Sequence, residues 1–270
     1  MEHCIGLAGD WHGDTSWAVE SLTRFAEAGI RVVHHLGDFG FWPGRGGAAY
    51  LLAVADATRR LGLSLAVTPG NHEDDDFLKT LRWADRGAPW GRVPYAARSI
   101  AVLPRGHRWA VRAGEVERSL VSLGGAPSVD FENRVPGVSW WPGESITEAD
   151  VRLTVAGGHA DVMLAHDSPS ASTPAVEAIL AANPFGWSQV ALAYAASGRA
   201  AMTAAFDGVR PRVFARGHYH VADTTTLPYA APTPPFPAKE CLVVSLADER
   251  RPGNLAVLHL DDLTVDWCLS

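Results

Sequence analysis

Cysteine is scarce in this chain, which has only three in 270 residues, Cys4, Cys241 and Cys268, none close to another in sequence. That pattern is typical neither of a disulfide-stabilised secreted scaffold nor of a zinc site built on paired cysteines. We therefore expect three free thiols and a reducing, cytoplasmic location. A chain of this length can bury a sizeable core without cross-links.

Basic residues are also in the minority, and long uninterrupted apolar runs are missing. The 23 lysines and arginines face 30 acidic residues, so the formal net charge is −7. We expect no extended nucleic-acid surface, because no general positive field would attract a polyanion. The most apolar long stretch, 175–206, is interrupted by residues such as Asn183 and Arg199, which argues against a membrane span. No basic segment precedes an apolar signal region either, because Met1 to Gly6 already runs into an apolar stretch.

The first third of the sequence alternates short apolar runs with amphipathic helical stretches. This alternation predicts parallel β-α-β units. The predicted strands lie in 4–10, 31–38 and 63–73, the helices in 15–29 and 48–62, and a glycine-rich loop in 39–47.

The rest of the chain has a different texture, but we find no domain boundary and predict a single domain over 1–270. Short alternating runs over 98–125 predict antiparallel strands. The other expected elements are a polar loop at 126–150, strands ending in loops at 161–169 and 212–220, helices over 174–206, a proline-rich surface connection at 225–240, and three antiparallel strands in 241–269.

Polar side chains recur at the points where the predicted strands end. They are Asp10, His12, Asp38, Asn71, His72, His166, His218 and His220. In an α/β sheet the carboxyl ends of the strands converge on one crevice, so these residues can meet there. Buried carboxylates and clustered imidazoles are costly unless cations neutralise them. The pattern therefore predicts a metal site.

The types of ligand indicate which metals to expect. Imidazole, carboxylate and amide oxygen without thiolate suit manganese, iron, zinc or nickel, and of these we expect manganese. So many ligands are too many for one ion with an open position. They suit two divalent ions about 3.5–4 Å apart, the separation used for displacement at phosphorus. Such ions would attract an anionic substrate locally, although the chain as a whole is acidic.

The order of these motifs closely resembles the calcineurin-like metallophosphoesterase superfamily. Five blocks, D-x-H, GD, GNHE, H and GH-x-H, follow one another between residues 9 and 220. The resemblance implies an α/β fold, a two-sheet β-sandwich flanked by helices with the metals at the carboxyl ends of strands. It also implies hydrolysis of a phosphate ester by a hydroxide that bridges the two metal ions.

The resemblance further implies a role for each residue of the blocks. Asp10, His12 and His220 would hold the first ion, Asn71, His166 and His218 the second, and Asp38 would bridge both. His72 would contact the phosphate and protonate the leaving oxygen as the catalytic acid. Glu73 or Asp74, the next residues, could hold its proton.

Two arginines of related enzymes are missing from this sequence. Protein serine/threonine phosphatases of the superfamily carry arginines in the second and third blocks, where this chain has GDFGFWPG and PGNHE. Their absence argues against a phosphoprotein phosphatase and favours slightly a phosphodiester or another small, nucleotide-like substrate. A phosphomonoesterase is the alternative. Arg45, Arg134 or Arg216 could replace the missing arginines, or could be ordinary loop and surface residues.

The segment 126–150 is the expected specificity loop, because functional loops often lie between core elements. It contains Arg134, a candidate for binding substrate together with Asn71 and His72. Trp140 and Trp141 could stack on a flat leaving group such as a nucleobase, or could cover the core. A non-catalytic protein-binding scaffold would be expected to lose metal ligands, and here all are present. The sequence leaves the oligomeric state open.

Overall fold

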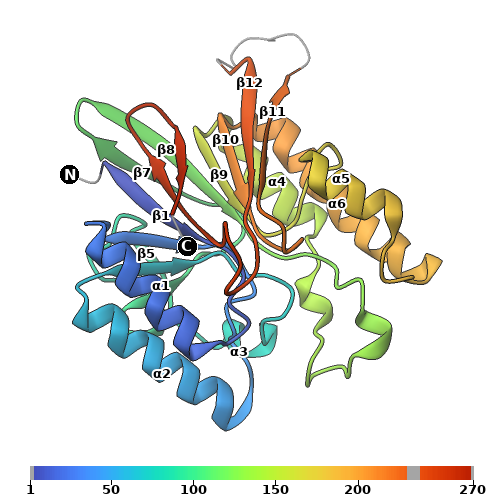
Figure 1. Cartoon of the computed structure of the whole chain (residues 1–270), viewed down its shortest axis with the longest axis horizontal. Coiled ribbons are helices and arrows are strands. Elements are labelled where there is room, and N and C mark those ends of the chain that lie inside the picture. Colours follow the sequence, from blue (N-terminus) through green and yellow to red (C-terminus); the bar gives the residue numbers. More distant parts are fainter. Residues whose placement is uncertain (1–2, 230–237, 269–270) are drawn as a thin grey trace.

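Two β-sheets pack face to face in this protein, and helices cover both outer faces (Figure 1). The structure is a computed structural model that describes residues 3–229 and 238–268. This arrangement confirms the predicted two-sheet sandwich flanked by helices.

The first sheet has eight strands and contains the predicted β-α-β units. In spatial order the strands are β14 (Val265–Trp267), β13 (Leu255–His259), β1 (Cys4–Ala8), β2 (Val32–His35), β3 (Ser64–Val67), β6 (Ile100–Val102), β5 (Arg92–Ala97) and β4 (Arg82–Asp85). The four central strands β1, β2, β3 and β6 run parallel.

The second sheet has six strands. Their spatial order is β11 (Asp223–Pro228), β12 (Glu240–Ser245), β10 (Val213–Arg216), β9 (Val162–Ala165), β8 (Val116–Leu123) and β7 (His107–Ala113). Strands β8, β9, β10 and β12 run parallel.

Four sequence expectations differ from the observed strands. The antiparallel tail was predicted as three strands, but β12 joins the second sheet beside β10, and β13 and β14 complete the first. Strand β6, expected to be antiparallel, lies parallel to β3. Strands β4 and β5 were not predicted. Of the proline-rich connection at 225–240, the first residues belong to β11, and 230–237 lie outside the described residues.

The hydrophobic core alternates with the two-residue period of the strands. In β9, Val162 and Leu164 face the core between the sheets, whereas Met163 and Ala165 face the outer helices. In β10, Phe214 faces outward in the same way. The inner core is therefore built from side chains of both sheets.

The helices cover the outer faces. Helices α1 (Thr15–Glu27) and α2 (Gly44–Arg60) pack on the first sheet, and α4 (Glu148–Ala156) and α6 (Gln189–Val209) pack on the second. The other two α-helices of the described residues are α3 (Asp75–Lys79) and α5 (Pro174–Ala182). Helix α2 begins inside the segment predicted as a glycine-rich loop. Within 3–229 and 238–268, no helix combines the length and the apolar character needed to cross a membrane.

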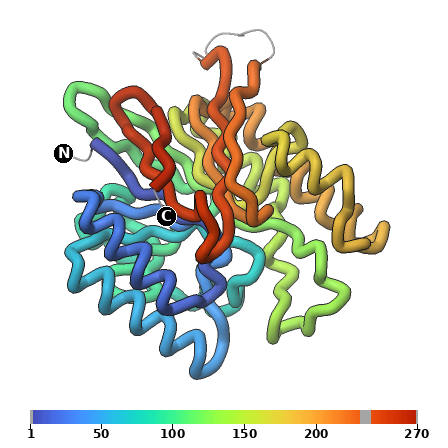
Figure 2. The backbone as a smooth tube through the Cα atoms, viewed as in Figure 1, coloured from blue at the N-terminus to red at the C-terminus, as the bar shows by residue number. Residues whose placement is uncertain are grey.

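The path of the chain brings residues from distant parts of the sequence to one edge of the sandwich. Figure 2 shows the backbone building the first sheet, then the second, and then returning so that β13 lies beside β1. Because the parallel strands of each sheet end at this edge, the loops after β1, β2, β3, β9 and β10 meet there.

We expect that Phe214→Ala will lower the free energy of unfolding by about 3–5 kcal/mol, because it leaves a cavity in a fully buried site. Phe214 packs edge to face on Phe206 of α6, with ring centroids 5.4 Å apart. Chemical denaturation monitored by circular dichroism would measure the change. Phe185→Ala is the matched control, since Phe185 is 75% exposed and its loss should change the free energy by no more than about 0.5 kcal/mol. Equal effects of the two variants would contradict the packing described.

Candidate metal centre

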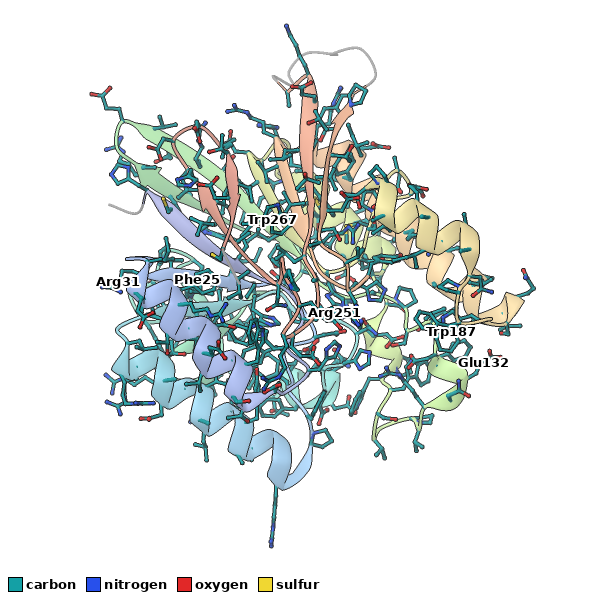
Figure 3. All side chains as sticks on the ribbon, in the orientation of Figure 1. Phe25, Arg31, Glu132, Trp187, Arg251 and Trp267 are labelled. Atoms are coloured by element: carbon teal, nitrogen blue, oxygen red, sulfur yellow. The ribbon has the colours of Figure 1, made fainter. Side chains whose placement is uncertain are left out.

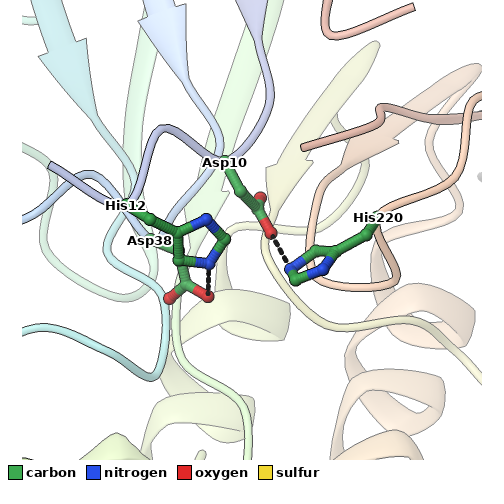
Figure 4. A group of neighbouring side chains, drawn as sticks. All are labelled: Asp10, His12, Asp38 and His220. Carbon is green, nitrogen blue, oxygen red and sulfur yellow. Dashed lines mark ion pairs between the residues drawn. The ribbon is translucent and has the colours of Figure 1, made fainter. Parts of the chain in front are cut away.

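The metal-ligand candidates follow the carboxyl ends of five parallel strands. Asp10 and His12 follow β1, Asp38 follows β2, Asn71 follows β3, His166 follows β9, and His218 and His220 follow β10. Figure 4 shows four of them, Asp10, His12, Asp38 and His220, pointing toward one another from the loops after β1, β2 and β10. The structure thus brings together residues that lie up to about two hundred positions apart in sequence.

Asp38 lies at the middle of this group, and its two carboxylate oxygens face different neighbours. Oδ1 is 3.4 Å from Nε2 of His166 and accepts hydrogen bonds from the backbone N–H groups of Asn71 and His72, each 3.0 Å long. Oδ2 is 3.5 Å from Nε2 of His12. One carboxylate therefore reaches two separate sets of imidazoles.

These contacts define two donor groups that share Asp38. In each group the donor atoms lie within 4.8 Å of one another. The first group is Asp10, His12, Asp38 and His220, and the second is Asp38, His166 and His218. Asn71 adjoins the second group, because its Oδ1 is 2.9 Å from Nε2 of His166.

Three of the histidines present Nε2 to the centre, and Nδ1 of each faces a group outside the two donor groups. Nδ1 of His166 is 2.7 Å from the backbone carbonyl of Leu36. Nδ1 of His12 is 2.8 Å from Oε2 of Glu249, and Nδ1 of His220 is 3.7 Å from Oδ2 of Asp248. Sequence reasoning missed these two acidic residues. They follow β12, so the strand-end position that identified the other residues could also have identified them.

Four candidate ligands adopt the left-handed backbone region that side chains other than glycine rarely occupy. The φ angles are 39° for His12, 53° for Asp38, 75° for His218 and 54° for His220. Such conformations cost about 1–3 kcal/mol each and concentrate at functional sites. Half of the eight described non-glycine residues with positive φ belong to this centre.

Glycines beside the ligands allow the loops to approach one another. A Cβ atom on Gly70 would lie 2.2 Å from Oδ1 of Asp38 and 2.8 Å from Nε2 of His166. A Cβ atom on Gly37, whose φ is 99°, would lie 2.1 Å from Nδ1 of His166. The glycines of the GD and GNH motifs are therefore required by the close packing around Asp38.

The centre strongly favours positive charge. Burial lowers the pKa of His12, but hydrogen bonds to Asp38 and Glu249 outweigh it and raise the pKa to about 11. His166 is also buried, and the charge of Asp38 raises its pKa to about 10. Burial opposes ionisation of Asp38, yet the neighbouring histidines hold its pKa well below the usual range.

Divalent cations suit this donor set. Imidazole, carboxylate and amide donors without thiolate are ligands of manganese, iron, zinc and nickel in proteins. The buried carboxylates of Asp10 and Asp38 need compensating charge, and cations on neutral imidazoles would supply it. The shared carboxylate and the two donor groups match a centre of two ions.

The loop at 126–150 reaches the centre through Arg134. Its Nη1 is 3.0 Å from Nδ1 of His72 and its Nη2 is 2.7 Å from Nε2, so it donates to whichever ring nitrogen carries the lone pair. The guanidinium is held by Asp130, 2.7 Å from Nε, and by the carbonyl of Ser139. Burial, with the charge of Arg134, lowers the pKa of His72. Arg45 and Arg216 were the other candidates to replace the missing arginines. Arg45 lies in α2, and Arg216 is fully buried.

Glu73 and Asp74 do not hold the His72 ring, contrary to expectation. Glu73 is buried and accepts hydrogen bonds from the backbone N–H groups of Phe39 and Gly70, 2.6 and 2.5 Å long. It thereby joins the loops after β2 and β3. Asp74 caps α3 by accepting a hydrogen bond from the N–H of Phe77.

Glu144 ties the same loop to the centre, a role that sequence reasoning did not identify. Its carboxylate accepts hydrogen bonds from Ser128 and from the indole N–H of Trp140, and Ser128 in turn accepts one from the side-chain amide of Asn71. Trp140 is half-buried, and Trp141 is buried, with 4% of its surface exposed. The loop also contacts the α5–α6 connection, where Figure 3 shows Glu132 and Trp187 close together and Ser188 bonds Glu132.

A buried carboxylate shared by two sets of imidazoles at the ends of parallel strands is typical of a metal-binding centre. The sequence profile described as calcineurin-like phosphoesterase matches residues 5–222 of this chain. The chain belongs to this family and is a metallophosphoesterase, as its motifs predicted.

Solved structures agree with the fold. The chain is similar to the protein TT1561 of Thermus thermophilus, with 10% identity, a TM-score of 0.54 and coverage of 98% of both chains. It is also similar to a dimetal phosphatase from Danio rerio, with 11% identity and a TM-score of 0.53 over 95% of this chain and 92% of that one. No curated protein matches the sequence significantly.

We expect that Gly70→Ala will weaken Mn²⁺ binding, because the new methyl group must displace Asp38 or His166. Overpacking of this kind also lowers the free energy of unfolding by about 1–3 kcal/mol. Calorimetric titration of metal-free protein with Mn²⁺ would measure the binding. Gly46→Ala in α2 is the control, since a Cβ atom there meets nothing within 4 Å. Unchanged Mn²⁺ affinity in Gly70→Ala would contradict the close packing around Asp38.

Proposed function

We propose that this metallophosphoesterase hydrolyses a small phosphodiester or a similar nucleotide-like ester at a centre of two Mn²⁺ ions. The observation that carries the proposal is the position of Asp38, which lies between two donor groups with His72 and Arg134 beside it. A phosphomonoester is the alternative substrate. Iron, zinc and nickel are the alternative metals.

The proposed ligands divide between the two positions as the donor groups do. Asp10, His12 and His220 would hold the first ion, Asn71, His166 and His218 the second, and Asp38 both. Two bound ions would supply a water of lowered pKa as nucleophile and would neutralise the charge of the phosphate. The protein contributes by fixing these side chains before the substrate arrives.

His72 and Arg134 would act on the substrate directly. Arg134 carries a fixed positive charge at the edge of the centre, and the guanidinium fork suits the oxygens of a phosphate. His72 would protonate the leaving oxygen, the role of a general acid. Asp130 and the carbonyl of Ser139 hold the guanidinium in place, which limits its motion when no substrate is bound.

The contact of Arg134 with His72 supports a substrate with one phosphate charge. The two arginines that grip a terminal dianion in protein phosphatases are missing, and Arg134 is the candidate that the structure places next to His72. We propose that Trp140, half-buried beside Phe131 at 5.9 Å between ring centroids, forms one wall of the substrate site. The leaving group would then be flat or apolar.

The number of domains and the location in the cell stay predictions. We propose that 1–270 form one domain, since the inner core combines side chains of both sheets. The cytoplasmic location is supported by the described cysteines, Cys4, Cys241 and Cys268, which form no disulfide with one another.

We expect His72→Ala to lower kcat by about 10²–10⁴-fold, the usual contribution of a general acid. The assay is release of p-nitrophenol from a phosphodiester and a phosphomonoester in parallel, with Mn²⁺ and with a chelator. Faster turnover of the diester, abolished by the chelator, is the expected outcome. Preference for the monoester would replace the diester in the proposal, and turnover that survives the chelator would overturn it.

We expect Arg134→Ala to lower kcat/KM for the preferred ester by about 10- to 100-fold, the effect of losing one hydrogen bond to a charged group. Steady-state kinetics on the same esters would measure it. Arg152→Ala is the control, because Arg152 pairs only with exposed Glu148 on α4 among its described ion pairs. If the two variants behave alike, Arg134 does not bind substrate.

A further inference from the structure

The loop between β12 and β13, residues 246–254, directs two acidic side chains to histidines of the first donor group. From this loop Glu249 reaches Nδ1 of His12 at 2.8 Å, and Asp248 lies 3.7 Å from Nδ1 of His220. The first distance is that of a strong hydrogen bond, whereas the second is too long for one. The loop lies outside residues 5–222, the part of the chain that the family profile matches.

This loop is fastened to the N-terminal part of the chain by two residues that follow Glu249. Arg250 pairs with Asp14, the N-cap of α1, through bonds of 2.6 and 3.0 Å. Asn254 donates to the backbone carbonyl of Asp10 at 3.1 Å and accepts a bond of 2.7 Å from the indole of Trp17. Glu249 is therefore held in place by its loop, although its side chain is 28% exposed.

The second donor group is supported in a different way. Nδ1 of His166 bonds to the backbone carbonyl of Leu36, and the His166 side chain is fully buried. A backbone carbonyl is neutral and fixed by the fold. His12, in contrast, depends on a charged side chain at the surface, and its own backbone is in the left-handed region.

We propose that Glu249 is a positioning residue that holds His12 toward the first metal position, so that this loop sets the affinity of one ion and not of the other. The inference rests on the two-ion centre of the proposed function. A carboxylate that accepts the Nδ1–H bond fixes the tautomer and orientation of the imidazole and makes Nε2 a better metal ligand. Loss of such a partner typically weakens metal binding by about 10- to 100-fold.

The test is calorimetric titration of metal-free protein with Mn²⁺ alone. We expect two binding events in the wild type. Glu249→Ala should weaken one of them by about 10- to 100-fold and leave the other within about twofold. Glu249→Gln keeps an acceptor oxygen for the Nδ1–H group and should recover most of the lost affinity. Visible absorption of the Co²⁺-loaded proteins should change for one bound equivalent in Glu249→Ala.

Two control variants distinguish a positioning role of Glu249 from a general effect of its negative charge and from an effect on folding. Glu148→Ala removes one negative charge from an exposed site on α4 and should leave both binding events unchanged. His218→Ala removes a donor of the second group and should weaken the other event, the one that Glu249→Ala spares. Equal weakening of both events by Glu249→Ala, no weakening at all, or no recovery in Glu249→Gln would each overturn the proposal.

Assays of p-nitrophenyl esters on the same preparations distinguish failure of this inference from failure of the proposed function. A wild type that binds two ions, responds to Glu249→Ala as expected and hydrolyses no ester would contradict the proposed function alone. An active wild type whose two Mn²⁺ affinities are both unchanged by Glu249→Ala would contradict the positioning role alone.

Discussion

The burial of the Asp38 carboxylate is the constraint on which the rest of the centre depends. An ionised carboxylate at 1% exposure is stable only if charges and hydrogen bonds around it replace the water it has lost. The backbone N–H groups of Asn71 and His72 supply part of this replacement, and the imidazoles of His12 and His166 supply more. The strained backbone and the close glycines follow from the need to bring so many groups to one carboxylate.

Two loops flank this carboxylate and differ in what they contribute. The loop at 126–150 brings Arg134 to His72, the residue that would meet the substrate, and its Glu144 also links to Asn71 through Ser128. The loop at 246–254 contacts His12 and His220 on the other side. In the proposed enzyme, recognition of the ester and retention of one ion are thus assigned to separate parts of the chain.

Much of the fold and the position of the centre could be predicted from the sequence because strand ends carry a strong signal. An apolar run followed by glycine and an acidic residue or histidine occurs after β1, β2 and β10, and each run was recognised. The pairing of strands was harder to predict than their positions. Strands β12 and β13 have similar apolar sequences, and only tertiary packing determines that they join different sheets. Strand β4 is largely exposed, so its residues lack the alternation that identifies a strand.

Asp248 and Glu249 were missed because they stand in a charged turn, where acidic residues are ordinarily solvated. The pairing of His72 with Arg134 depends on the path of a long loop, which no local pattern encodes.

The antiparallel pairing of β1 with β13 has a consequence for how the protein forms. Cys4 lies opposite His259 in that pair, so one neighbour of the first strand is made only after some 250 further residues have left the ribosome. Contacts so distant in sequence form slowly, because a long loop must close before they contribute. Until β13 arrives, β1 has an unpaired edge, and the loop that bears Glu249 cannot reach His12. A nascent chain would thus assemble the neighbourhood of His12 last, after synthesis has passed β12, and a pause before that point would leave an open sheet edge exposed to other chains.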